Sequence, residues 1–251
     1  MSDYFLGQGK MYIAARDASG NPLAQRWMGD VSAAKVSLKV KKVQQQESFT
    51  GQRSIVKSIS LDKDANIDLT LLEISAENLA LALFGKSVTI GSSSVTGEAM
   101  PVDLISGDRI SLKYPQVTSV VVTDSSATPV VMNASKYMID AAYGAIVLTD
   151  VTGFTQPFKV AYTHAAIENV SIFSAVQSEV FLRYEGINLA ENGAPIIVEL
   201  YRVSTEPLKD LPLITEKISD MNLSAAVMID VSKPASDEMG QFGRIMKVKP
   251  L

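Results

Sequence analysis

The sequence predicts a mainly β protein: an antiparallel β-sandwich or barrel with one packed α-helix and a small inserted β domain. Three observations support this fold class. Six segments alternate apolar and polar residues with a period of two, which is typical of strands that bury one face. Only one segment carries strong helix signals. A stretch rich in Ser, Gly and Thr precedes a region with its own strand and turn signals, which indicates an insertion.

The six alternating segments fall in both halves of the chain. Their apolar positions are Val36, Leu38 and Val40; Ile67, Leu69 and Leu71; Phe158, Val160 and Tyr162; Val180, Leu182 and Tyr184; Ile196, Val198 and Leu200; and Val227, Ile229 and Val231. Because the residues between them are mostly polar, each strand is expected to have one buried and one solvated face. This pattern favours antiparallel sheets over parallel ones, whose strands are usually apolar on both faces.

The helix is expected in the segment SAENLALALFGK. Ser75 can cap its N-terminus, and Glu77 suits the positive end of the helix dipole. Leu79 and Leu83 share one face, and Gly85 is expected just after the last turn. A helix this short and apolar is expected to pack against a sheet.

The chain is predicted to form two domains, one inserted into the other. Residues 1–85 and 177–251 form the first domain, and residues 86–176 form a small β domain between them. The insertion opens with the linker KSVTIGSSSVTGEAMP, and its segment KYMIDAAYGAIVLT predicts a tight hairpin that turns at residues 141–144.

Composition excludes several classes of protein. The net charge is -4, with Lys+Arg 23 against Asp+Glu 27, and no basic block exceeds two residues, so a dedicated nucleic-acid binder is not expected. Zero cysteines exclude disulfides and thiolate metal sites and suit folding in a reducing cytoplasm. The segment MSDYFLGQGKMYIAARD does not resemble a signal peptide, and no apolar run reaches the roughly 18 residues needed to span a bilayer. No membrane partner is therefore expected.

Neither a metal site nor an active site is predicted. The segment DKDANIDLTLLE, residues 62–73, places acidic or amide side chains like a calcium loop, but Ile67 stands where that loop needs glycine, so a strand is the better interpretation. The only histidine, His164, cannot build a multi-histidine site, and the chain contains no GxSxG nucleophile motif. Carboxylates brought together from distant positions stay possible, but we expect no cofactor and no enzyme.

Three long segments resemble one known family. They are FLGQGKMYIAARDASGNPLAQRWMGDVSAAKVSLKV, DANIDLTLLEISAENLALALFGK, and YEGINLAENGAPIIVELYRVSTEPLKDLPLI followed by QFGRIMKVK. In this order, around one apolar helix and a variable insertion, they resemble the tail tube (major tail) proteins of long-tailed bacteriophages. The resemblance covers most of the first domain, at both ends of the chain.

The resemblance implies a structural protein of the virion tail, assembled in the cytoplasm of the bacterial host. Six copies would close into a ring whose inner sheets join as one barrel, and rings would stack into the tube that conducts DNA. Expected partners are further copies of the chain, the tape-measure protein, and tail-initiation or terminator proteins. DNA would pass through the lumen without specific binding.

A row of polar strand residues is expected to line that lumen. The predicted row comprises Lys39, Lys41, Asp68, Thr70, Glu179, Arg183 and Asp230. These residues alternate with apolar ones, so they lie on a solvated sheet face. The alternative is that they form the outer face of an ordinary monomeric sandwich.

The segment VQQQESFTGQRSIVKSISL, residues 43–61, is too long for a minimal hairpin turn. Long connections in compact domains are often functional or mobile. We expect an extended hairpin or loop that reaches the adjacent ring, with Phe49 and Arg53 as inter-ring contacts. A mobile surface loop is the alternative.

Two other classes of function stay open. The tube of a contractile tail or of a secretion system would have the same physical features. A carbohydrate- or receptor-binding β-sandwich of the virion would use the insertion for recognition. Clustered exposed aromatic residues would favour binding, but Tyr137, Tyr143 and Phe154 are scattered along the insertion.

Overall fold

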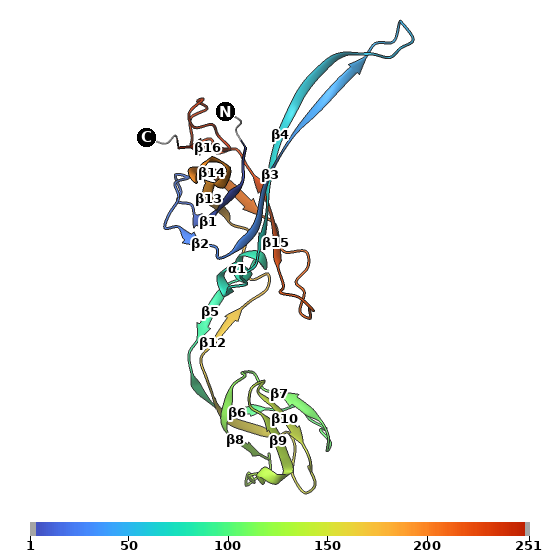
Figure 1. Ribbon diagram of the computed structural model, residues 1–251. Helices are drawn as coiled ribbons and strands as arrows, with labels where there is room; N and C mark the ends of the chain where they lie inside the picture. Colours follow the sequence, from blue (N-terminus) through green and yellow to red (C-terminus); the bar gives the residue numbers. More distant parts are fainter. Residues whose placement is uncertain (1–3, 249–251) are drawn as a thin grey trace. The chain divides into compact units, whose positions relative to one another are not determined.

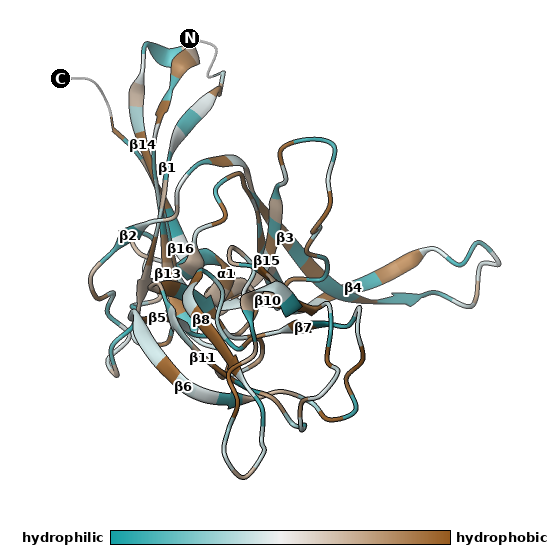
Figure 2. Cartoon of the chain, turned by 90° about the horizontal axis from the view of Figure 1, so that it is seen from below, coloured by the Kyte–Doolittle hydropathy of each residue, from teal (hydrophilic) through white to brown (hydrophobic). Residues whose placement is uncertain are grey.

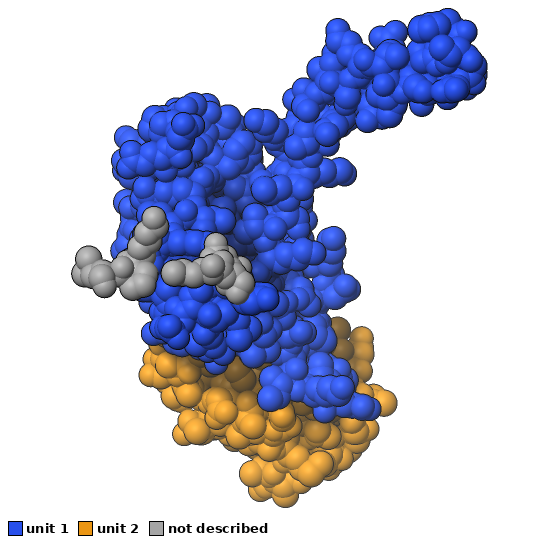
Figure 3. Space-filling model, turned by 45° about the horizontal axis from the view of Figure 1, so that its top comes forward, with its two compact units in different colours: residues 1–87, 170–251 blue, residues 88–169 orange. Residues whose placement is uncertain are grey.

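The computed structural model describes residues 4–248, and the chain forms two compact units. Unit 1 combines residues 1–87 with 170–251, and unit 2 comprises residues 88–169 (Figure 3). The insertion predicted at residues 86–176 contains all of unit 2. The fold is mainly β with antiparallel sheets, and it has a single α-helix among the described residues, so the predicted fold class is confirmed.

Unit 1 is built around one large antiparallel sheet (Figure 1). Its elements are β1 (Gly7–Ala15), β2 (Arg26–Trp27), β3 (Val31–Gln46), β4 (Ile55–Leu71), α1 (Ala76–Ala82), β13 (Glu179–Asn188), the 3₁₀ turn Leu189–Glu191, β14 (Ala194–Thr205), β15 (Met221–Val227) and β16 (Gly243–Lys247). The strand order is β2-β1-β13-β14-β15-β4-β3. One half of β14 pairs with β16 and the other half with β15, so the sheet divides along this strand.

The core of unit 1 lies on one face of this sheet. In β4 the residues Ala65, Ile67, Leu69 and Leu71 are buried, and Asp68 between them is exposed, as the alternation predicts. The same face of the sheet contributes buried side chains from β1, β13, β14 and β15. Helix α1 packs against this core through Ala82 and the partly buried Leu79 and Leu81, as expected.

The predicted start of the helix is confirmed, but its end differs from the prediction. The Ser75 hydroxyl accepts a hydrogen bond from the Asn78 amide at 3.2 Å. At the other end Phe84, with φ 48°, adopts the left-handed conformation, and the Gly85 amide donates to the Ala80 carbonyl at 2.8 Å. Gly85 is needed for a different reason: a Cβ there would lie 1.7 Å from the Ser171 carbonyl oxygen.

The strand predicted at residues 227–231 is wrong beyond its first residue. Strand β15 ends at Val227, and the chain then turns. The turn is held by the Asp230 carboxylate, which accepts a hydrogen bond from the Ser232 amide at 3.0 Å and pairs with Arg16 at 2.6 Å. These contacts keep Asp230 buried.

Unit 2 contains two small sheets with a core of their own. Its strands are β6 (Ser93–Ala99), β7 (Arg109–Ser111), β8 (Val117–Thr123), β9 (Tyr137–Asp140), β10 (Ala145–Leu148) and β11 (Lys159–His164), with a 3₁₀ turn at Ala134–Lys136. The sheets have the orders β7-β10-β9 and β6-β11-β8. Strands β5 (Ser87–Ile90) and β12 (Ile167–Val170) pair where the chain passes between the units. The predicted hairpin is confirmed, because β9 and β10 pair across a turn that ends at Gly144, φ 59°.

Candidate assembly surface

Strands β3 and β4 form a hairpin far longer than the rest of the sheet. They pair from Val31 opposite Leu71 to Gln46 opposite Ile55, and they project well beyond the body of unit 1 (Figures 1 and 3). Burial along β4 ends at Ala65, so residues 37–64, the hairpin arm, make almost no contact with the core. The predicted extended hairpin is therefore present. Whether it reaches an adjacent ring stays a prediction.

The hairpin arm exposes many apolar side chains. Leu38 is 79% exposed, although it follows Val36 on the sheet face that elsewhere packs in the core. The other exposed apolar residues of the arm are Val40, Val43, Phe49, Ile55, Val56, Ile59 and Leu61. Hydrophobic segments recur along the projecting strands (Figure 2). Exposed apolar surface of this extent is typical of interaction sites.

The tip of the arm is an ordered turn. The Glu47 carboxylate accepts hydrogen bonds from the amides of Phe49 at 3.2 Å and Thr50 at 2.9 Å, and also from the Thr50 hydroxyl. These bonds, chiefly those from Thr50, hold the pKa of Glu47 below its ordinary value. The turn presents Phe49, which is 83% exposed, and the exposed Arg53, so both predicted contacts lie at the tip.

On β3, β4 and β15 the opposite face of the sheet is mostly polar. We call it the polar face, and on β3, β4 and β15 it consists of Lys35, Ser37, Lys39, Asp64, Asn66, Asp68, Thr70, Asn222 and Ser224. The strand register places Lys35 beside Asp68 and Lys39 beside Asp64. Opposite charges directly across a strand pair attract each other, so positive and negative side chains alternate over this surface.

Hydrogen bonds fix two of the predicted lumen residues on the polar face. Asp68 accepts from the Ser224 hydroxyl at 2.7 Å, and the Thr70 hydroxyl donates to Asn222 at 2.8 Å. The predicted Lys41 lies farther out on the arm, where its ammonium group is 3.9 Å from Asp62. Asp68, Thr70 and Lys39 therefore share one surface patch.

An ion-pair network joins β13 and β14 to the residues that follow β1 and β15. Arg202 pairs with Glu179 at 2.6 Å, and Arg16 bridges Glu179 at 3.2 Å and Asp230 at 2.6 Å. The hydrogen bond from Arg202 holds the pKa of Glu179 below its ordinary value, against the opposing effect of burial. On the same strands, Arg183 pairs with Glu185 at 2.7 Å and also with Glu199.

The structure divides the predicted row of lumen residues. Glu179 is exposed and pairs with Ser204 of β14, which is opposite Ala226 beside the polar face, so the polar surface continues onto β13. Arg183 is half-buried. Asp230 is only 3% exposed, because it caps its own turn and neutralises Arg16, so it does not belong to an exposed row.

Some polar-face residues were absent from the predicted set, namely Lys35, Ser37, Asp64, Asn66, Asn222 and Ser224. The alternation in AKVSLKV, DANIDLT and MNLSAAV is the signal that identifies them. Their grouping depends on which strands are neighbours, and that information is not in the alternation itself.

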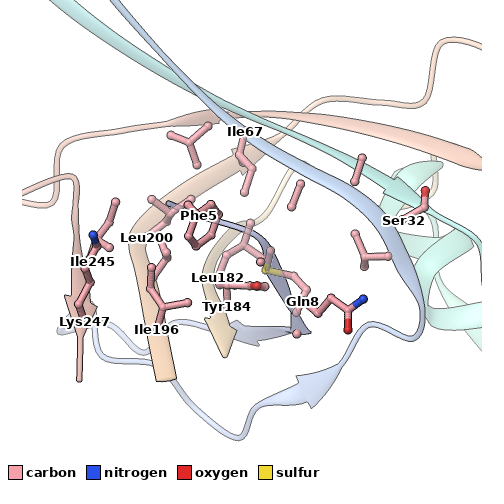
Figure 4. Close-up of a pocket in the computed structure, with 18 residues that line it drawn as sticks. Phe5, Gln8, Ser32, Ile67, Leu182, Tyr184, Ile196, Leu200, Ile245 and Lys247 are labelled. Carbon is pink, nitrogen blue, oxygen red and sulfur yellow. The ribbon is translucent and has the colours of Figure 1, made fainter. Parts of the chain in front are cut away.

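The sheet of unit 1 curls around a groove of ≈ 810 Å³ (Figure 4). One side is formed by residues of β3 that include Val31 and Val36, and another by residues of β1 that include Met11; apolar side chains such as Leu182 and Ile196 also line it. Strands β1 and β3 stand near the two ends of the strand order, and within the described residues β3 pairs with β4 alone. Its second edge is therefore unpaired.

Within residues 4–248, no group of three or more His, Asp or Glu side chains is placed to hold a metal ion. His164 is buried in unit 2, stacks on Tyr114 with ring centroids 4.1 Å apart, and has its two ring nitrogens 2.9 Å from the Ser93 hydroxyl and 2.8 Å from the Ala165 carbonyl. Both ring nitrogens of this buried histidine therefore have hydrogen-bond partners, as expected for a core residue. No helix of the described chain is long and apolar enough to cross a membrane.

Comparison with known proteins places the chain in a family. The model of the family described as "Protein of unknown function UCP028589" matches residues 4–246, which cover unit 2 and nearly all of unit 1. The chain therefore belongs to this family. No curated protein matches it significantly.

Proposed function

We propose that this member of the UCP028589 family is a structural subunit of a phage tail tube, in which hexameric rings stack and conduct DNA into the host. The observation that carries the proposal is the hairpin arm. Its apolar side chains are exposed in a single copy, and Leu38 alone is 79% exposed. A soluble monomer gains nothing from such a surface, whereas an assembly buries it.

The unpaired edge of β3 supports the same proposal. An open edge of this length is an aggregation hazard unless another strand covers it. In a ring, the edge would pair with a strand of the neighbouring copy, so that the sheets join into one barrel. Closure into a barrel removes open edges altogether.

The polar face suits the inner surface of such a barrel. It carries Lys35 beside Asp68 and Lys39 beside Asp64, so its charges largely cancel. DNA binding strengthens with the number of phosphates that a protein neutralises. A surface of balanced charge therefore lets DNA pass without holding it. The virion tail is the location that this role requires.

Shortening the hairpin arm tests the proposal. Residues 43–59 are replaced by Asn-Gly, which joins the paired residues Lys42 and Ser60 through a two-residue turn. The variant should fold, because the removed side chains do not contribute to the unit 1 core. The wild-type chain should form rings and hollow tubes by negative-stain electron microscopy and light scattering, and the variant should not form tubes.

The matched control is Tyr143→Ala, which removes an exposed aromatic residue of unit 2 and should leave tube formation unchanged. Tubes of normal length from the shortened variant would contradict the role of the arm. A wild-type chain that stays monomeric even with its tail-initiation partners would favour the receptor- or carbohydrate-binding alternative.

A further inference from the structure

A second exposed apolar surface lies in the loop between β14 and β15. We call residues 206–220 the acidic loop. Leu213, Ile214 and Ile218 are 87%, 97% and 89% exposed. The start of the loop is anchored, because the Leu208 amide donates to the Ala82 carbonyl at 2.8 Å and the Leu208 side chain packs against the core. The start of the loop that carries these exposed side chains is therefore held against the unit 1 core.

The acidic loop and the hairpin arm lie at opposite ends of the same strands. The loop leads into β15 at Met221, which pairs with Leu71 at the last residue of β4. The arm is formed by the other end of β4, beyond Ala65. In Figure 1 the arm rises above the sheet, whereas the orange-red loop extends the other way beside β15.

The two surfaces carry opposite charge. The arm has six basic and three acidic side chains, and the acidic loop has two basic and four acidic ones. On the arm, Lys63 pairs directly opposite Val40 and so lies on the same strand face as Leu38. In the loop, Glu216 stands between Ile214 and Ile218 in sequence. The arm therefore combines apolar side chains with a positive charge, and the acidic loop combines apolar side chains with a negative charge.

We propose that the hairpin arm of one copy docks on the acidic loop of the next copy, with Leu38 against Ile214 and Lys63 beside Glu216. This inference rests on the proposed function and names the receiving surface of the ring-to-ring contact. Because the two surfaces differ and lie at opposite ends of the unit, the contact is heterologous. A heterologous contact that does not close on itself generates an open-ended stack.

Cysteine cross-linking tests the contact directly, since the natural chain has no cysteine. Leu38→Cys and Ile214→Cys are made as separate proteins, mixed, assembled and oxidised. The mixture should give a cross-linked dimer that contains one copy of each variant. The control pairs Leu38→Cys with Ile105→Cys, a 65% exposed residue of unit 2, and should give far less product.

Charge reversal provides a second readout. Lys63→Glu and Glu216→Lys should each raise the concentration needed for assembly, and the two changes made in the same chain should restore it. If the wild-type chain forms tubes but the assembled cysteine variants give no mixed cross-link, or give mainly cross-links between two copies of Ile214→Cys, the docking is overturned and the proposed function stands. A wild-type chain that never assembles would contradict both.

Discussion

Substitutions at two apolar residues of the β3–β4 hairpin should distinguish an effect on folding from an effect on assembly. Ile67 is 2% exposed and packs in the unit 1 core, whereas Leu38, on the same face of the strand pair, is 79% exposed. Ile67→Ala leaves a cavity and should lower the free energy of unfolding by roughly 3 kcal/mol. Leu38→Ala should change it by less than about 0.5 kcal/mol, as is usual for surface substitutions.

Assembly should respond to Leu38 instead. Complete burial of a leucine side chain stabilises by about 2 kcal/mol. Since 79% of Leu38 is available for burial in a contact, the side chain should contribute about 1.5 kcal/mol there. That free energy corresponds to roughly a tenfold change in affinity, so Leu38→Ala should raise the concentration needed for assembly about tenfold.

Both effects can be measured on the same proteins. Urea unfolding, followed by fluorescence of the single tryptophan, Trp27, gives the free energy of unfolding. Light scattering over a dilution series gives the concentration at which assembly begins. Leu38→Ala with an unchanged assembly concentration would refute the assignment of the hairpin arm as an interface.

Two further predictions concern folding of unit 1. Arg202 holds the pKa of Glu179 below its ordinary value of 4.5, so this stabilisation is present above that pH and is lost as the pH falls through the folded pKa. The urea midpoint should therefore fall more steeply between about pH 5 and 3 in the wild type than in Glu179→Gln; parallel curves would argue against it. Gly85→Ala places a Cβ 1.7 Å from the Ser171 carbonyl and should lower Tm by at least about 5 °C, whereas Gly91→Ala meets nothing within 4 Å. Equal Tm values by circular dichroism would contradict the close approach.

The strands of the core were predictable because burial on one face imposes a period of two. Ile67, Leu69 and Leu71 alternate with exposed or half-buried polar residues for this reason. The hairpin arm was harder to predict. Leu38 and Val40 alternate with lysines as in a strand that buries one face, yet they are 79% and 45% exposed, so the alternation wrongly predicts their burial. Both faces of the arm are solvated in one copy. Residues 43–61 therefore predicted an extended hairpin or a loop, without deciding between them.

The candidate site was predictable where it follows from alternation and not where it follows from tertiary contacts. Asp68 and Thr70 were found by alternation, but Lys35 and Ser224 become part of the same surface only through the register of β3, β4 and β15. The prediction that Asp230 lies in an exposed polar row was wrong for a similar reason. Its ion-pair partner Arg16 lies 214 positions away in the chain, and no local pattern reports such a pair.

The most direct test of the tube proposal is cryo-electron microscopy of the assembled wild-type chain. We expect six-fold rings stacked into a hollow tube, with the polar face that carries Asp68 directed toward the lumen and the hairpin arm crossing between rings. A monomer under all assembly conditions, or an assembly with this face on its outside, would contradict the account.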